Sequence, residues 1–547
     1  MHLLRTFLLS TATCASTLLA VSSQHAYASS AAVSHDYQHV LLISVDGMHA
    51  VDLTNWIERH PTSNFATLAS HGIIYTNAFT TAPSDSYPGM LAQVTGATPK
   101  TGGLFYDDSY DRTEYPSKAS YTSRGLVDPG CTGHPGTEVT NFEELDKSYN
   151  YSTALVADIA GGGKLGEVYT QLDPDHMQRK IVDGKCRPVY PHEYVRTNTI
   201  FEVIREAGLR TAWSDKHPAY ENLSGPSGSG LDELFTPEIN SQDLLDPGAK
   251  TGDDYTTSYT GVRTYDSIKV NAVLNWIDGY NSTRTKKEPV PAIFGMNFQA
   301  VSVGQKLAMS GDADADKSLT GGYLDSNATP GNALTQQLRF VDDALGKFEH
   351  ELVEKHLDES TLIIVSAKHG QSPIDKRVRL AISDAPYGST PGFGTHGFEI
   401  CDDEALVWLA PELQQAINPK TGHSYYADAE AYILAHAGEL QIAQLLDRNS
   451  LTPLYGDPFS NSRVPDFIAV TNHGVICTGG TKLAEHGGFS DDDRNVALLL
   501  SAPHLNREYV ETLTDTTQIA PTILHALGLN TSRLDAVRIE GTQVLTH

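Results

Sequence analysis

Four polar side chains with catalytic or metal-binding potential stand beside apolar runs of this sequence: Asp46, Lys368, His369 and His486. Asp46 directly follows the run His39–Val45, and the Lys-His pair follows Leu362–Val365. Apolar β-branched runs of this length are typical of strands buried on both faces of a parallel sheet. Ligands of open α/β sheets bind beyond the carboxyl ends of the strands. The sequence therefore predicts that these side chains meet at one edge of a sheet.

A serine-rich segment, TTAPSDSYPGM at residues 80–90, leads into a helical pattern that ends near Gly96. Pro88 suits the first turn of this helix. Backbone N–H groups point outward at a helix N-terminus and favour an anionic ligand there. Ser86 is thus a candidate nucleophile. A serine here can also serve as the helix N-cap, a role for which Ser84 and Asp85 compete.

The elements that would position these side chains alternate along the chain. Strands are predicted at residues 39–45, 72–79, 209–214, 292–298, 362–365, 405–410, 467–470 and 496–501. Helices are predicted near residues 50–60, 64–71, 197–207, 261–279, 332–357, 427–447 and 515–529. Such alternation favours a single α/β domain over residues 36–547, with a mostly parallel central sheet and helices on both faces. Residues 100–191 lack the alternation, so we expect them to form a disulfide-pinned, cap-like insertion over the active-site edge.

The first 28 residues predict an export signal. Arg5 supplies a positive charge, the apolar run Phe7–Val21 follows, and Ala26-Tyr27-Ala28 fits a cleavage site. The run is too short and too polar to span a membrane, and no later segment is long and apolar enough. A net charge of −28 argues against binding to a nucleic-acid scaffold. We therefore expect a secreted, extracellular or periplasmic protein.

Four cysteines remain after removal of the signal: Cys131, Cys186, Cys401 and Cys477. An even number in an oxidising compartment predicts two disulfides, although four free buried thiols are the alternative. Three pairings are possible. Proximity in sequence favours Cys131 with Cys186 and Cys401 with Cys477.

Five segments, in this order, resemble the alkaline phosphatase superfamily and especially its nucleotide pyrophosphatase/phosphodiesterase branch: VLLISVDGM, PSDSYPGMLAQVTG, IIVSAKHGQ, AEHGG and DTTQIAPTILHALGL. The resemblance implies an alkaline-phosphatase-like fold. It also implies two zinc ions, one that activates a Ser or Thr nucleophile and one that holds the leaving or attacking oxygen. By position, Ser86 would be the nucleophile, Asp46 and His369 would ligate one ion, and His486 would ligate the other.

The sequence departs from that family at three ligand positions. Lys368 stands where the family has an aspartate. The family segment Glu-Pro-Asp-x-x-Gly-His is matched by residues 299–305, which puts Val301 and Gln305 at its ligand positions. Valine cannot bind zinc, and an amide oxygen binds it poorly. We therefore expect one divalent ion, zinc, rather than two, with Lys368 as a catalytic cation beside the phosphoryl group. His486 is then also a candidate general acid.

These features predict an exported hydrolase of phosphate esters, acting on phosphodiesters or pyrophosphates of small or nucleotide-like molecules. Gln299, Gln305 and His217 are the expected substrate-binding residues, although the two glutamines could equally belong to a buried structural cluster. The missing ligands leave an alternative, a catalytically decayed anion- or glycan-binding protein on the same fold. A sulfatase-like or phosphonate hydrolase with one metal is less favoured, because a Cys-x-Pro-x-Arg segment is missing from the sequence.

Overall fold

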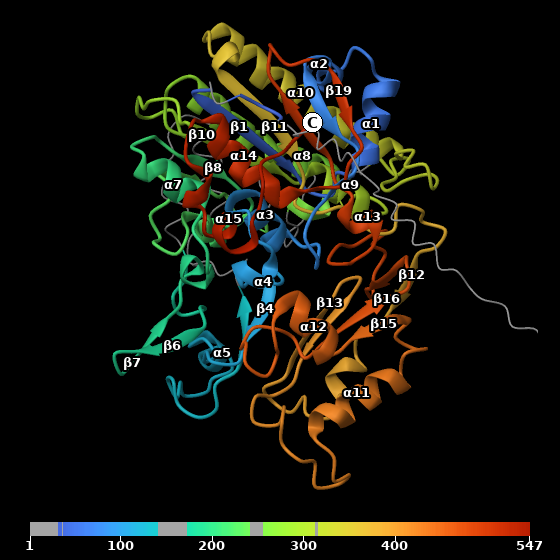
Figure 1. Ribbon diagram of the computed structural model, residues 1–547. Coiled ribbons are helices and arrows are strands. Elements are labelled where there is room, and N and C mark those ends of the chain that lie inside the picture. Colours follow the sequence, from blue (N-terminus) through green and yellow to red (C-terminus); the bar gives the residue numbers. More distant parts are fainter. Residues whose placement is uncertain (1–30, 35–36, 141–171, 241–254, 312–315) are drawn as a thin grey trace, which may run out of the picture.

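The computed structural model describes residues 31–34, 37–140, 172–240, 255–311 and 316–547 (Figure 1). The predicted export signal, residues 1–28, lies outside the described residues, as does the stretch 141–171 of the expected insertion. None of the helices in the described part is long and apolar enough to cross a membrane.

An eight-stranded sheet lies at the centre, in the order β19-β2-β18-β11-β1-β10-β8-β9. The strands are β1 (His39–Val45), β2 (Gly72–Tyr75), β8 (Ala212–Ser214), β9 (Glu233–Phe235), β10 (Ile293–Phe298), β11 (Thr361–Ser366), β18 (Leu498–Ser501) and β19 (Glu508–Val510). β1 pairs in parallel with β10 and β11, whereas β18 runs antiparallel to β11 and β2. The predicted mostly parallel sheet is confirmed.

Alternate residues of β1 face two separate apolar cores, as the two-residue period of a strand requires. Leu41 and Ile43 belong to one core, and Val40 and Leu42 belong to the other. The first core is covered by α1 (Ala50–Arg59), α2 (Asn64–Ser70), α8 (Tyr259–Ile277) and α10 (Asn332–Glu354). The second is covered by α3 (Ser86–Thr95), α7 (Ile200–Glu206) and α14 (Ile519–Ala526). Helices therefore cover both faces, as the sequence predicts.

A second, four-stranded antiparallel sheet lies apart from the first, in the order β13-β14-β16-β15 (Figure 1). It consists of β13 (Phe398–Cys401), β14 (Ala405–Trp408), β15 (Ile442–Leu446) and β16 (Phe467–Thr471), with α11 (Tyr425–Ala435) and α12 (Arg448–Tyr455) beside it. Its faces hold two apolar clusters of their own. The strands expected at 405–410 and 467–470 are confirmed, but they pair here rather than in the central sheet. The helical prediction for 427–447 is wrong at its end, where β15 forms.

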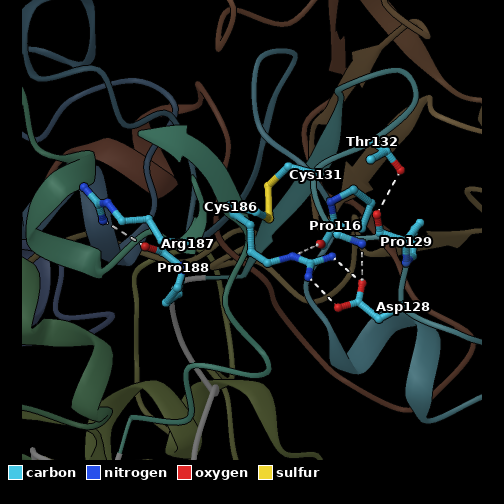
Figure 2. The surroundings of a disulfide bond; sticks show 10 residues. Pro116, Asp128, Pro129, Cys131, Thr132, Cys186, Arg187 and Pro188 are labelled. Carbon is cyan, nitrogen blue, oxygen red and sulfur yellow. Dashed lines mark hydrogen bonds and ion pairs between the residues drawn. A yellow bond between two sulfur atoms is a disulfide. The ribbon is translucent and has the colours of Figure 1, made fainter. Parts of the chain in front are cut away.

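Two hairpins belong to the expected insertion: β4 (Asp108–Asp111) with β5 (Thr137–Thr140), and β6 (Arg179–Val182) with β7 (Lys185–Pro188). The Cys131–Cys186 disulfide pins the second hairpin to the loop before β5 (Figure 2). The Cys401–Cys477 disulfide joins β13 to β17 (Val475–Cys477). Both favoured pairings are thus confirmed.

Short elements complete the described chain: β3 (Ala78–Phe79), α4 (Pro99–Gly102), α5 (Ala119–Thr122), α9 (Ala300–Lys306), β12 (Leu380–Ile382), α13 (Asp491–Arg494), β20 (Thr514–Asp515) and α15 (Asp535–Glu540). Among them, α9 follows β10 at the sheet edge where Asp46 and His369 lie.

Candidate active site

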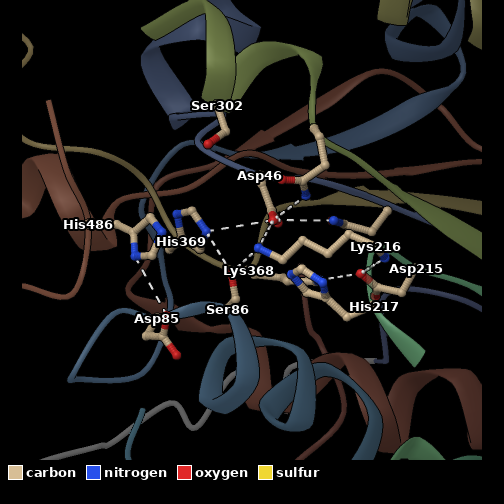
Figure 3. A network of polar contacts seen from close by, with 12 residues as sticks. Asp46, Asp85, Ser86, Asp215, Lys216, His217, Ser302, Lys368, His369 and His486 are labelled. Carbon is tan, nitrogen blue, oxygen red and sulfur yellow. Dashed lines mark hydrogen bonds and ion pairs between the residues drawn. The ribbon is translucent and has the colours of Figure 1, made fainter. Parts of the chain in front are cut away.

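The carboxyl ends of β1 and β11 bring Asp46 and His369 together (Figure 3). Asp46 Oδ2 lies 3.7 Å from His369 Nε2, and both side chains are buried. The next residue, Gly47, has a φ of +80° and donates its N–H to the His369 carbonyl. A Cβ at this glycine would come within 2.3 Å of the Gln305 amide oxygen, so the turn that holds the pair requires glycine.

Helix α3 presents Ser86 to this edge. The preceding residue, Asp85, is the N-cap and accepts a hydrogen bond from the Tyr87 N–H, so the Ser86 hydroxyl is not used as the cap. Ser86 Oγ instead lies 3.3 Å from His369 Nε2. A Cβ at Gly89 would come within 2.1 Å of the Lys368 carbonyl oxygen, so this glycine allows the helix to pack directly against the chain beyond β11.

Lys216 is a site residue that the sequence prediction missed. Its Nζ donates a hydrogen bond to Ser86 Oγ at 2.9 Å and lies 3.6 Å from Asp46 Oδ2. The residue comes two positions after β8, just as Asp46 follows β1, so the same strand-end argument could have found it.

Lys368, which we expected to be a catalytic cation, does not point toward Ser86. Its Nζ donates to Asp215 Oδ1 at 2.8 Å and to the Tyr220 hydroxyl at 2.7 Å, and it lies 4.0 Å from the centre of the Tyr220 ring. Burial lowers the pKa of Lys368, while Asp215 and Asp46 oppose that shift. The structure therefore corrects the expected arrangement, because Lys216 and not Lys368 brings an ammonium group to the serine.

Asp46 is held as a carboxylate by the cations around it. Burial alone would raise its pKa, but the charges of Lys368, His369 and Lys216 hold the pKa of Asp46 well below its usual range. Its Oδ2 also accepts a hydrogen bond from Gln299 Nε2 at 2.6 Å. Its Oδ1 accepts none from the part of the chain that the structure describes.

The ring of His486 lies beside that of His369, with 3.9 Å between the ring centres. His486 Nδ1 is 3.6 Å from Asp85 Oδ2. Burial, reinforced by the positive charges of His369, Lys306 and Lys216, lowers the pKa of His486 well below its usual range. The lowered pKa favours the neutral form of the imidazole, and the general-acid role of His486 stays a prediction.

A pocket of about 450 Å³ opens on this edge and is lined by both Lys216 and His486. His217 and Gln299, two of the predicted substrate contacts, also line it. Ser86 is fully buried and lies behind Lys216. Gln305 is buried as well; its amide donates to the carbonyl of Gly47, so the structure places it in a hydrogen-bonded cluster and not at the pocket.

The sequence between residues 40 and 493 matches the family model described as Type I phosphodiesterase / nucleotide pyrophosphatase. The chain belongs to this family. Its members hydrolyse phosphoester bonds, so membership places the chain among the phosphoester hydrolases. The predicted resemblance is confirmed.

Solved structures show the same fold. Murine ectonucleotide pyrophosphatase/phosphodiesterase 5 is 14% identical with a TM-score of 0.52, over 90% of this chain and 96% of that one. The human protein of the same name is 15% identical with a TM-score of 0.51, over the same shares of the two chains. The alkaline phosphatase PafA is 12% identical with a TM-score of 0.57, over 90% and 96%. A comparison with the curated proteins finds no matching relative.

Members of the Type I phosphodiesterase family are typically zinc-dependent, but the donors of this chain do not fit zinc. Val301 is a buried apolar residue, the Gln305 amide is hydrogen-bonded elsewhere, and the Lys368 ammonium is bound to Asp215. The Lys216 ammonium stands between Asp46 and Ser86, where it would repel a cation. Within the residues that the structure describes, no group of three or more His, Cys, Asp or Glu side chains could hold a metal ion.

Proposed function

We propose that this protein is an exported phosphodiesterase or pyrophosphatase in which Ser86 is the nucleophile. One observation carries the proposal: Ser86 Oγ, in the first turn of α3, lies between Lys216 Nζ at 2.9 Å and His369 Nε2 at 3.3 Å. A serine flanked by a cation and an imidazole is the arrangement from which a hydroxyl attacks phosphorus. Family membership supports the reaction class.

The contacts of His369 indicate where the serine proton goes. His369 Nδ1 lies 2.8 Å from the carbonyl oxygen of Gly370. A carbonyl only accepts hydrogen bonds, so in the neutral ring Nδ1 carries the hydrogen and the lone pair of Nε2 faces Ser86. His369 is therefore the proton acceptor of the proposed reaction, with Asp46 placed to stabilise the imidazolium that forms.

In the proposed reaction Ser86 Oγ forms a bond to phosphorus as its proton moves to His369 Nε2. The bond from phosphorus to the leaving oxygen breaks, and that oxygen takes up a proton from solvent, to which His369 releases the proton it received. A water then attacks phosphorus and gives a proton to His369, which passes it to Ser86 Oγ as the bond from Ser86 to phosphorus breaks. Because Ser86 is buried behind Lys216, the Lys216 side chain must shift enough to admit the phosphoryl group while its ammonium group stays within reach of Ser86 Oγ.

The substrate class is a small phosphodiester or pyrophosphate, including nucleotides. An inactive variant of the murine neighbour is known in complex with AMP, which supports a nucleotide for this chain. The pocket of about 450 Å³ has room for a ligand of this size. Export is supported by the two disulfides, which persist in oxidising compartments. Because the donors of this chain do not fit zinc, the proposed reaction includes no metal ion.

Replacing the nucleophile tests the proposal. We expect Ser86→Ala to lower kcat/KM for bis(p-nitrophenyl) phosphate at least about 1,000-fold, with a Tm within about 3 °C of the wild type. Ser84→Ala is the matched control, because the Ser84 hydroxyl donates only to the Asp493 carbonyl; its kcat/KM should stay within about threefold.

Equal activity in wild type and Ser86→Ala would refute the serine mechanism. A wild type that turns over no phosphodiester or pyrophosphate would instead favour the decayed anion-binding protein. The complete burial of Ser86 and the loss of three family ligands are the observations behind that alternative.

A further inference from the structure

The geometry points to Lys216 as a catalytic residue: its ammonium group takes the place of a metal ion beside Ser86, and the hydrolysis proceeds without a divalent cation. This inference rests on the proposed function and names the group that activates its nucleophile. It follows from where the Lys216 ammonium lies and from what the other donors of the site are already bound to.

The ammonium group of Lys216 contacts every part of the site that a catalytic cation must serve. It lies 2.9 Å from Ser86 Oγ and 3.6 Å from Asp46 Oδ2, and its side chain, 12% exposed, lines the pocket. An ammonium group has three N–H donors and a compact charge. It can therefore hold the serine oxygen and still donate to an oxygen of a phosphoryl group that enters from the pocket.

The backbone around Lys216 is fixed, so this contact is built into the fold. Strand β8 pairs in parallel with both β10 and β9. Asp215 is fully buried and accepts hydrogen bonds from Trp213 Nε1 at 2.9 Å and from the Lys216 N–H at 2.9 Å. Asp215 also binds the Lys368 ammonium group. Among the described residues, Lys216 is the lysine that donates to Ser86.

The charge balance of the site supports a fixed cation in this place. Asp46 is the carboxylate that contacts the side chains of both His369 and Lys216. A metal ion in the same space would meet the Lys216 ammonium group, whereas the family ligand set offers carboxylates and imidazoles. In the proposed reaction the proton of Ser86 moves to His369 and not to Lys216. The role of Lys216 is to stabilise the charge that develops on Ser86 Oγ and on the phosphoryl oxygens.

Chelation and substitution together test this inference. The wild type is dialysed against EDTA and 1,10-phenanthroline, its metal content is measured by elemental analysis, and kcat/KM is measured on bis(p-nitrophenyl) phosphate. We expect the metal-free protein to keep at least about half of its activity. Loss of activity on chelation, with recovery on addition of Zn²⁺, would overturn the inference and leave the proposed function intact.

Lys216→Met removes the charge and keeps the length of the side chain. We expect kcat/KM to fall by about 100- to 1,000-fold, the usual cost of removing one preorganised donor. Lys216→Arg keeps the charge, so its kcat/KM should fall less than that of Lys216→Met. In Lys216→Ala, added ethylamine should restore part of the activity, which a purely structural lysine would not allow. The exposed Lys286→Met is the control and should match the wild type.

Binding of inorganic phosphate separates this inference from the proposed function. Calorimetry on the metal-free proteins should give a dissociation constant for phosphate that is at least about tenfold weaker in Lys216→Met than in the wild type. If the wild type turns over no ester but shows this difference, the proposed reaction fails while the anion-binding role of Lys216 stands. Equal phosphate affinity in the two proteins, or equal activity, would overturn the role of Lys216.

Discussion

Two buried polar clusters lie on either side of Gly47, and they differ in how fully their hydrogen bonds are satisfied. The reactive cluster consists of Asp46, Asp85, Ser86, Lys216, His369 and His486. The amide cluster consists of His49, Asp52, Ser302, Gln305, Tyr323 and Gln371. In the reactive cluster, Asp46 Oδ1, Asp85 Oδ2 and His486 Nδ1 have no hydrogen-bond partner in the described part of the chain. In the amide cluster every polar side-chain atom has one.

This difference indicates that the reactive cluster is a site for chemistry and that the amide cluster stabilises the fold. Gln305 donates to the Gly47 carbonyl and to the Tyr323 hydroxyl, both at 2.7 Å, and accepts from the Gln371 amide. Side chains whose polar atoms are all hydrogen-bonded within the chain stabilise the fold and have less capacity left for a ligand. The sequence resemblance assigns Gln305 to one of the family's zinc-ligand positions, and in this chain its amide is part of the hydrogen-bonded framework. The three buried atoms of the reactive cluster keep hydrogen-bonding capacity that the described residues do not use.

The largest expected effect comes from placing an aspartate at position 301, where the family resemblance expects a zinc ligand and this chain has Val301. This side chain is fully buried in the core beneath β1 and α10. If the metal site on this side is lost, Val301→Asp buries an unpaired charge and should lower the free energy of unfolding by about 3–5 kcal/mol. Urea unfolding with and without Zn²⁺ measures this change in the free energy of unfolding. Val301→Ala, which removes volume without adding charge, should cost about 1–3 kcal/mol and is the control. Restoration of the Val301→Asp stability by Zn²⁺ would contradict the comparison.

The strands that hold the reactive cluster were predictable because their signals are local. β1 has the predicted bounds, and β11 differs by one residue at each end. Asp46 and His369 were expected at their ends for the same reason, and the segment around Ser86 follows from its motif. The assignment of Lys368 failed for a geometric reason. Consecutive side chains of an extended chain point to opposite sides, so the backbone that turns His369 toward Ser86 turns Lys368 toward Asp215.

Other features depend on contacts between distant parts of the chain. The strands β14 and β16 have ordinary strand patterns, but their local sequences do not indicate that they pair with each other rather than with the central sheet. Lys216 was overlooked because lysines are mostly exposed. Its place just after β8 was an available signal, and the Asp215 and Ser86 contacts show that this lysine belongs to the site. The amide cluster was left as an alternative because hydrogen-bond saturation cannot be derived from composition.

Two glutamines of one segment give a smaller and more discriminating test. Gln305→Leu leaves the Gly47 carbonyl and the Tyr323 hydroxyl with fewer partners, so we expect a loss of about 2–3 kcal/mol in stability and less than about threefold in kcat/KM. Gln299→Leu removes the 2.6 Å hydrogen bond to Asp46 at the pocket. We expect this variant to lose activity more than stability: kcat/KM should fall about tenfold, and the free energy of unfolding should fall by less than about 1.5 kcal/mol. Urea unfolding and steady-state kinetics on both variants measure the contrast. The comparison fails if both variants lose the same property.

The smallest expected effect concerns Asp402, at the turn between β13 and β14, where the second sheet meets the reactive cluster. Asp402 accepts a hydrogen bond from the Tyr106 hydroxyl at 2.7 Å, and that hydroxyl also lies 3.2 Å from the His486 carbonyl oxygen. Burial and the charge of Glu485 raise the pKa of Asp402 from 3.8 to about 7. Between these two values the folded state binds more protons than the unfolded state. This group therefore makes stability fall as pH rises from about 4 to about 7.

Asp402→Asn keeps an acceptor for the Tyr106 hydroxyl and removes the titration. Between pH 5 and pH 8 the wild type should lose more free energy of unfolding than the variant, as measured by urea unfolding at both pH values. Other buried acids contribute to the slope of both proteins, among them Glu399, whose pKa burial raises to about 7, and their contributions cancel in the difference. The exposed Asp183→Asn is the control and should leave the wild-type slope unchanged. Equal slopes for wild type and Asp402→Asn would mean that the turn of the second sheet is not electrostatically coupled to the pocket.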